Sequence, residues 1–249
     1  MASRLEDLRL AYERKGDNAS FDAILRAQQV LNDAGVIDPK DISPILEPDF
    51  SHDIEAVRRE LARQTEIYLK VGVHHAVEEL PEVIMERVFD LARLRPEEFG
   101  DSFPIPLVVM GKLPLPILSR ISGVKIDFPE SVVADFKRPD ESKDLYLIWM
   151  QDGTKNQGEP IRDVRYHPSN NEYGATVREG LSLLVTHPTA LRHHDIALPG
   201  SYISSFDNAT VPLLKSRPDR SVSLEITPDV TYYPRLGTAT VGIPPTKSA

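Results

Sequence analysis

The run DLYLIWMQDG, residues 144–153, constrains the fold more strongly than any other stretch of this chain. Its apolar side chains fall on both alternating faces, which is typical of a strand in the middle of a sheet. The pair Asp152-Gly153 is a turn sequence that ends such a strand. A central strand needs neighbouring strands and cover on both of its faces, so the rest of the chain must supply both.

Further strand patterns all follow residue 100. The run IPLVVM at 105–110 is a short β-type segment, and SVSLEI at 221–226 alternates apolar and polar side chains. The RPDR turn before SVSLEI indicates a hairpin with VPLLK at 211–215, and TATVGI at 238–243 predicts one last short strand. Prolines interrupt LPLPILSRISG at 113–123, so a broken segment is expected there.

Helical periodicity dominates the first hundred residues. Residues 1–38 carry two apolar stripes at helical spacing, which we interpret as a helical hairpin extension. Three closely spaced prolines make residues 39–50 a linker. Residues 51–243 are predicted to form the main α+β domain, and residues 244–249 a frayed tail.

Two helices open the predicted main domain. Ser51 is expected to cap the first helix, and Pro81 fits the first turn of the second. The apolar positions of the first helix, Ile54, Val57, Leu61 and Tyr68, are expected to point inward. The second helix carries the apolar residues Val83, Ile84, Val88 and Leu91. His74-His75 lies between them and is interpreted as part of a solvated loop.

One more helix is predicted among the strands. Thr176 and Glu179 fit a capping box, an apolar stripe follows, and Pro188 marks the end of the helix. Residues 176–187 should therefore form a single helix. Together these patterns predict an α+β fold in which N-terminal helices are followed by a largely antiparallel sheet with one capping helix.

Charge argues against a nucleic-acid partner. The formal net charge is −9, and basic residues are scattered among acids. Arg58, Arg59 and Arg63 lie close together, but Glu55 precedes Arg59 by one helical turn, so we interpret them as an ion-paired surface.

The chain lacks the residues or motifs that several kinds of site require. The chain contains no cysteine, which excludes disulfides, thiolate metal sites and a cysteine nucleophile. There is no GxSxG elbow, phosphate-binding loop or GxGxxG pattern, so no cofactor is expected. The N-terminus MASRLEDLRLAYERKG does not resemble a secretory signal, and no apolar run is long enough to cross a membrane. We therefore expect a cytoplasmic protein without a membrane partner.

The stretch LVTHPTALRHHDIALPGS, residues 184–201, is the richest in polar side chains that could carry function. The spacing of His187 and His193 is compatible with zinc ligands, but Pro188 interrupts the element and no supporting motif accompanies it, so we predict no metal. We expect a helix end that continues into a glycine-broken loop. The predicted ligand-binding residues are Arg192, His193, His194, Asp195, Ser201 and Tyr202.

Trp149 and Tyr146 offer a possible stacking platform. A tryptophan within a strand that is apolar on both faces is more often part of the core, and we predict that position for Trp149.

Two blocks of the sequence resemble a known family. DLYLIWMQDGTKNQGEP and TVREGLSLLVTHPTALRHHDIALPGS, followed by VPLL and LGTATVG, are similar to a mainly actinobacterial family catalogued as domain of unknown function 5701. The resemblance covers residues 54–242 and implies the same order of helices and strands, but no particular activity. Tyr202 and Leu214 stand where the family pattern has arginine and tryptophan. Any role that this arginine and this tryptophan have in the family is therefore not expected in this chain.

Two functions are compatible with these observations. The first is a non-catalytic protein that binds a small ligand or a protein partner through its C-terminal sheet region, with a possible homodimer through the N-terminal helices. The alternative is a hydrolase whose site assembles from His187, His193, Asp195 and Ser201. Because the sequence shows no recognisable nucleophile motif, it favours the first.

Overall fold

The computed structural model describes residues 50, 52–99, 101–126, 128–136, 144–166, 172–204, 209–217, 219 and 221–242. The chain divides between Asp49 and Phe50, and the second unit is described below. The predicted N-terminal hairpin, the linker before Phe50, dimerisation through these helices and the C-terminal tail lie outside the described residues.

Three helices begin the described part: α4 (Ile54–Lys70), α5 (Val73–Val77) and α6 (Pro81–Leu91). Asp53 caps α4 by accepting hydrogen bonds from the Glu55 and Ala56 amides at 2.9 and 3.1 Å, so the prediction of Ser51 as the cap is wrong. The N-cap residue must directly precede the first helical residue, which is Ile54, so Asp53 and not Ser51 occupies that position.

The basic residues of α4 form ion pairs, as predicted. Arg58 pairs with Glu55 at 2.6 Å and Arg59 pairs with Asp53 at 3.3 Å, while Arg63 binds Glu60. These cations are therefore engaged by neighbouring acids on the helix surface.

The connection between α4 and α6 differs from the expected loop. Residues 73–77 form the short helix α5, in which the rings of His74 and His75 lie 3.9 Å apart. Pro81 is the first residue of α6, as predicted, and Ile84 and Val88 are buried. Val83, another of the apolar residues expected on this helix, is 41 % exposed.

A four-stranded sheet lies beside these helices, in the order β1-β4-β11-β5, and all its strand pairs are antiparallel. Its strands are β1 (Ile105–Met110), β4 (Leu145–Gln151), β11 (Thr240–Gly242) and β5 (Glu172–Gly174). The predicted central strand is β4, which lies between β1 and β11, and Trp149 is fully buried within it. Gly153 follows β4 with φ +103°, the left-handed conformation expected of the turn.

A buried amide protects the edge of this sheet. The Gln64 side chain of α4 donates to the Pro106 carbonyl at 2.6 Å and accepts from the Val108 amide at 2.9 Å. It thereby satisfies backbone groups of edge strand β1 that would otherwise be free to pair with another strand.

The second sheet has the order β10-β6-β8-β9-β2. Its strands are β10 (Leu236–Thr238), β6 (Asp195–Ala197), β8 (Thr210–Ser216), β9 (Val222–Pro228) and β2 (Val124–Ile126). β8 and β9 form the predicted antiparallel hairpin, whereas β10–β6 and β2–β9 are parallel pairs. A separate antiparallel pair joins β3 (Val133–Asp135) to β7 (Ser201–Ile203).

The run TATVGI was expected to form one strand, but the chain changes sheet within it. Thr238 ends β10 in the second sheet and Thr240 begins β11 in the first. Ala239 lies between them, and its amide donates to the Ala197 carbonyl at 3.0 Å. The strands therefore remain largely antiparallel but divide into three sheets instead of one.

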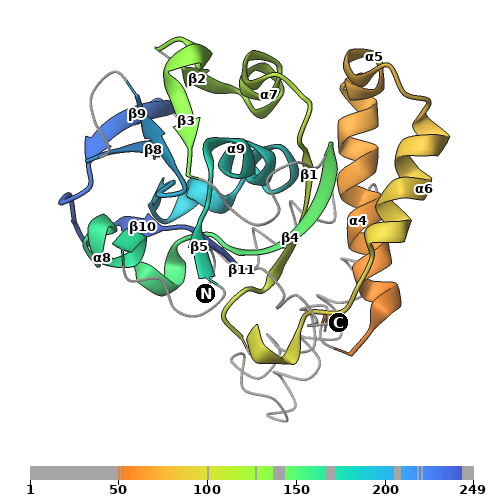
Figure 1. Ribbon diagram of the computed structural model, residues 1–249, viewed down its shortest axis with the longest axis horizontal. Coiled ribbons are helices and arrows are strands. Elements are labelled where there is room, and N and C mark those ends of the chain that lie inside the picture. Colours follow the sequence, from red (N-terminus) through yellow and green to blue (C-terminus); the bar gives the residue numbers. More distant parts are fainter. Residues whose placement is uncertain are drawn as a thin grey trace, which may run out of the picture. The chain divides into compact units, whose positions relative to one another are not determined.

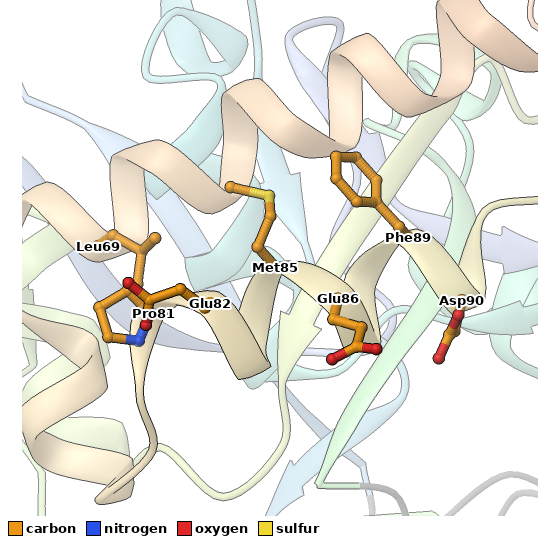
Figure 2. A pocket seen from close by; sticks show the side chains of 7 residues that line it. All are labelled: Leu69, Pro81, Glu82, Met85, Glu86, Phe89 and Asp90. Carbon is orange, nitrogen blue, oxygen red and sulfur yellow. The ribbon is translucent and has the colours of Figure 1, made fainter.

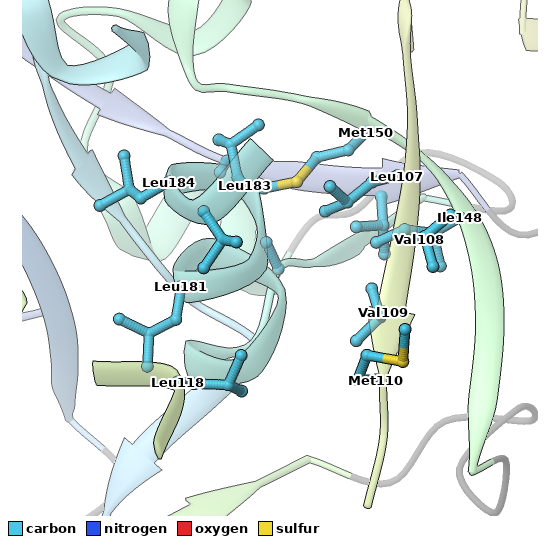
Figure 3. Close-up of a cluster of buried hydrophobic side chains, with 14 of the residues drawn as sticks. Leu107, Val108, Val109, Met110, Leu118, Ile148, Met150, Leu181, Leu183 and Leu184 are labelled. Atoms are coloured by element: carbon cyan, nitrogen blue, oxygen red, sulfur yellow. The ribbon is translucent and has the colours of Figure 1, made fainter. Parts of the chain in front are cut away.

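The predicted capping helix is α9 (Val177–Thr186), and the capping box of Thr176 and Glu179 is present. The helix lies between the two larger sheets (Figure 1). Figure 3 shows Leu183 of α9 on the side toward Leu107 and Met150 of the first sheet. The main hydrophobic core also includes Ile196, Leu198, Leu214 and Leu224 of the second sheet region, so α9 contributes to packing on both sides.

Besides α5, two other short helices were not predicted. α7 (Leu115–Ser122) forms within the proline-interrupted segment, because Pro114 occupies the N-cap and Pro116 the first turn, where proline is tolerated. α8 (Ile161–Tyr166) contributes Ile161 to a second, smaller core with Ala197, Val211, Leu213 and Leu236. The remaining turns include the 3-10 helices η1 (Glu97–Phe99), η2 (Glu130–Val132), η3 (Thr154–Asn156) and η4 (Ala190–Arg192).

The structure confirms the α+β fold class. None of the helices in the described ranges is long and apolar enough to span a membrane.

Candidate functional site

The polar stretch 184–201 is more regular than the expected loop. α9 ends at Thr186 with His187 as its C-cap, and η4 and β6 follow. The predicted helix end is confirmed, whereas η4 and β6 replace part of the loop that was predicted after it. Local turn signals could not reveal the strand, because β6 is held by pairing with β10 and β8 from distant parts of the chain.

Asp195 and His194 are buried and hydrogen-bonded within the fold. The Asp195 carboxylate accepts from the Tyr233 hydroxyl at 2.6 Å and from the Ser216 amide at 3.2 Å. His194 Nε2 donates to the Asp152 carbonyl at 2.9 Å. These bonds connect β6 and its flank to neighbouring segments, which is a structural role.

Ser201 is also buried. Its hydroxyl donates to an Asp135 carboxylate oxygen and accepts from the Val177 amide at 2.9 Å, so it satisfies one of the free amides at the start of α9. The neighbouring Gly200 has no room for a side chain, because a Cβ atom there would lie 2.2 Å from the Gly174 carbonyl oxygen. This segment is therefore packed closely against the backbone around residue 174.

A residue that the sequence did not single out holds the same segment. The Arg165 side chain is 3 % exposed and donates to the carbonyl oxygens of Pro199, Ser201 and Thr210 at 3.2, 2.9 and 3.3 Å. Its guanidinium also lies 4.6 Å from the centre of the Phe136 ring. No motif in IRDVRY distinguishes Arg165, since its partners are far away in the sequence.

Tyr202 belongs to the same packing arrangement. Its ring lies 4.9 Å from that of Phe136 and is half-buried. Of the six predicted ligand-binding residues, only Arg192 and His193 are exposed. Their role in ligand binding stays a prediction.

A carboxylate, an imidazole and a hydroxyl meet near the end of α9, in the order used by hydrolases. Glu60 lies 3.5 Å from His187 Nε2, and His187 Nδ1 lies 2.8 Å from the Thr186 hydroxyl. However, Thr186 is buried and its hydroxyl donates to the Ser182 carbonyl at 3.0 Å. The hydroxyl oxygen then accepts from His187, which is the reverse of the hydrogen bond that activates a nucleophile.

The same contacts affect the charge of Glu60. Burial alone would raise the pKa of its carboxyl, but hydrogen bonds from Arg63 and His187 and their charges outweigh burial and hold the pKa well below the ordinary value. Arg63 donates to both carboxylate oxygens, and the Gln64 amide donates at 2.9 Å. Glu60 therefore stabilises the junction of α4 and α9 as a carboxylate.

We expect Glu60→Gln to lower the free energy of unfolding at pH 7 by about 1–3 kcal/mol, the usual range for hydrogen bonds to a charged group. Because the folded-state pKa is depressed, the carboxylate contributes fully above the unfolded pKa near 4.5 and loses its contribution as pH falls further. Urea denaturation should therefore show the difference between variant and parent narrowing below pH 4.5.

The matched control for this prediction is Glu66→Gln on the same helix, where the carboxylate is exposed and lies 3.8 Å from Lys70. We expect that substitution to cost less than about 0.5 kcal/mol at every pH. A Glu60→Gln difference that stays constant from pH 7 to pH 3 would contradict the assignment.

Neither the polar stretch nor another part of the described chain brings together three or more histidine, cysteine, aspartate or glutamate side chains that could hold a metal ion.

A hollow with a volume of about 540 Å³ lies along α6 (Figure 2). We call it the α6 groove. It is lined by Leu69 of α4 and, on α6, by Pro81, Glu82, Met85, Glu86, Phe89 and Asp90. Figure 2 shows Met85 and Phe89 on the side of α6 toward α4, with Glu86 and Asp90 pointing away from α4.

Apolar and acidic side chains form separate rows along the groove. Pro81, Met85 and Phe89 repeat every four residues and form an apolar row. Glu82, Glu86 and Asp90 repeat in the same way one position later and form a parallel acidic row. No hydrogen bond or ion pair joins the acidic row to another residue in the described part of the chain.

Exposed apolar side chains are frequent in the part of the chain that carries this groove. Among described residues, the large exposed ones are Val71, Leu80, Val83, Phe89 and Leu94 near α6, and Tyr166, Val230 and Tyr232 elsewhere. Leu80 is 67 % exposed and Phe89 is 40 % exposed. Sequence reasoning missed this surface, although the four-residue repeat in PEVIMERVFD could have indicated it.

A second hollow of about 390 Å³ lies in the C-terminal region and is lined by Gln157, Gly158, Tyr232 and Pro234. It is smaller and less apolar than the α6 groove, and it contains none of the predicted ligand-binding residues.

No family model matches the chain, and searches of curated proteins and of solved structures found no match. The resemblance to domain of unknown function 5701 stays a prediction that rests on the blocks quoted above.

Proposed function

We propose that this chain is a non-catalytic binding protein and that it holds a protein partner in the α6 groove. The single observation that carries the proposal is the apolar row beside Leu80, which leaves apolar side chains, Leu80 and Phe89 among them, exposed on one face of the molecule. Such patches are typical of surfaces that another macromolecule covers. The cytoplasmic location expected from the sequence belongs to the same proposal.

The construction of the groove favours a protein over a small ligand. Six of its seven lining residues lie on one helix, and only Leu69 lies on another. A small-molecule site usually encloses most of the ligand surface, which requires walls on several sides. A long, one-sided surface instead suits a partner that brings its own apolar face.

The C-terminal region supports a binding site less well. His194, Asp195 and Ser201 use their polar groups in hydrogen bonds within the fold. The hydrolase alternative loses support for the same reason, because Ser201 is fully buried and its hydroxyl is already bound by Asp135 and Val177.

Site-specific photo-cross-linking in cells that naturally make the protein tests the proposal. The photoreactive residue p-benzoylphenylalanine would replace Phe89 in the groove, His193 in the predicted C-terminal site, or Tyr232 in the second hollow. All three positions are exposed, so the reagent should be tolerated at each of them. We expect adducts with another protein from position 89, and few from positions 193 and 232.

Adducts that arise only from position 193 would overturn the assignment to the groove and favour the C-terminal region. A cross-link from position 89 to the same chain would show that the groove is covered from within, and would also overturn it.

A further inference from the structure

We infer that the partner presents an amphipathic helix with lysine or arginine along one flank, and that this flank lies over the acidic row of the α6 groove. The inference rests on the proposed function and adds the chemistry of the partner. It is carried by the parallel rows of apolar and acidic side chains, described above, on one exposed helix.

The length of the apolar row suits a helical partner. From Pro81 to Phe89 the row spans about 12 Å, or just over two helical turns, at 1.5 Å per residue. A helix bound in a groove presents its own apolar residues every three or four positions, which matches the repeat of this row. The flanking Leu80 extends the apolar surface beyond the start of α6.

The negative charge of the acidic row is not balanced by cations on α6. Carboxylates four residues apart on a helix repel each other, and Glu82, Glu86 and Asp90 make two such pairs. The sequence PEVIMERVFDL contains one cation, Arg87, and both oxygens of Glu79 bind it at 2.6 and 2.7 Å. A basic flank on the partner would relieve this repulsion without disturbing an existing ion pair.

Charge also decides against two other occupants. A symmetric contact between two copies centred on the groove would bring the acidic row against itself. An anionic membrane surface would be repelled by the same carboxylates. A basic helix therefore fits the groove better than either.

The test uses two synthetic peptides of about sixteen residues, both helical and both with leucines at every third or fourth position on an alanine background. The basic probe carries four lysines along one flank, and the acidic probe carries glutamates at the same positions. Binding of each fluorescent probe to the full chain is measured by anisotropy.

We expect the basic probe to bind about tenfold or more tightly than the acidic probe, as three exposed ion pairs of ordinary strength would allow. In the triple variant Glu82→Lys, Glu86→Lys, Asp90→Lys the preference should reverse. Met85→Asp should weaken the binding of both probes, because it places a charge in the apolar row.

The matched control is the triple variant Glu97→Lys, Glu98→Lys, Glu159→Lys, which changes the net charge equally at exposed positions outside the groove. It should keep the preference for the basic probe. If it loses the preference as fully as the groove variant, the net charge of −9 explains the binding and the inference fails.

The outcomes separate the inference from the proposed function. If neither probe binds, or both bind equally, while cross-linking from position 89 still captures a protein, the basic helix is wrong and the binding groove stands. If cross-linking also fails, both proposals fall.

Discussion

Replacement of Trp149 by alanine is expected to lower the free energy of unfolding by about 3–5 kcal/mol, the usual cost of removing a large aromatic side chain from a core. Trp149 is fully buried in the central strand β4, and its ring lies 6.2 Å from that of Phe50. Truncation would leave a cavity that the paired strands on both sides cannot close, because their hydrogen bonds hold them in place.

Urea denaturation followed by far-UV circular dichroism measures this effect, since the chain has no other tryptophan to report by fluorescence. Trp149→Phe is the control, with an expected loss of about 1–2 kcal/mol, because less volume is removed. The Trp149 ring nitrogen is buried without a hydrogen-bond partner among described residues, so phenylalanine also removes an unsatisfied donor. An alanine variant that loses less than about 1 kcal/mol would contradict the core assignment.

Arg165→Met is the second substitution expected to have a large effect, a loss of about 3–5 kcal/mol, as for other buried charges whose partners are left behind. Three backbone carbonyls would lose their donor, and Asp229, 3.9 Å away, would lose its nearby cation. The segment that carries Ser201 should loosen first, because Arg165 binds the carbonyls on both sides of Gly200.

Chemical denaturation measures the loss in the free energy of global unfolding. Hydrogen exchange at the Gly200 amide, which donates to the Ala175 carbonyl at 2.9 Å, measures the loss of local stability. Arg165→Lys serves as the control, since it keeps the charge but its compact ammonium group cannot span the three carbonyls that the planar guanidinium reaches, and an intermediate loss is expected. If Arg165→Met costs less than about 1 kcal/mol, the guanidinium is not needed to hold the fold. The region of Ser201 and Tyr202 would then become a stronger candidate for ligand binding.

The sequence predicted those elements that depend on local chemistry. The alternation in DLYLIWMQDG identified β4 as a central strand, and the spacing of Thr176 and Glu179 identified the start of α9. Proline at position 81 and the turn before Ser221 likewise marked a helix start and a hairpin. Each of these signals involves residues within a few positions of one another, so the rest of the chain is not needed to interpret them.

The candidate sites depended on contacts that the sequence does not display. A serine or aspartate in a polar stretch can bind a ligand or satisfy the backbone, and the choice depends on which groups the fold brings to it. Ser201 meets Asp135 and Val177, and Asp195 meets Tyr233, across separations of 24 to 66 residues. Such partners cannot be identified from spacing along the chain.

The division into three sheets and the exposure of the α6 groove were likewise decided by tertiary structure. Ala239 transfers the chain from one sheet to another because both neighbouring strands find partners there, β6 for β10 and β4 for β11. On α6, Ile84 and Val88 are buried while Met85 and Phe89 line the groove, although both pairs show the same apolar four-residue spacing. Periodicity determined that α6 is a helix, but a helix can turn only part of its circumference toward its neighbours. Packing against α4 and β4 decided which apolar row was buried and which stayed partly exposed.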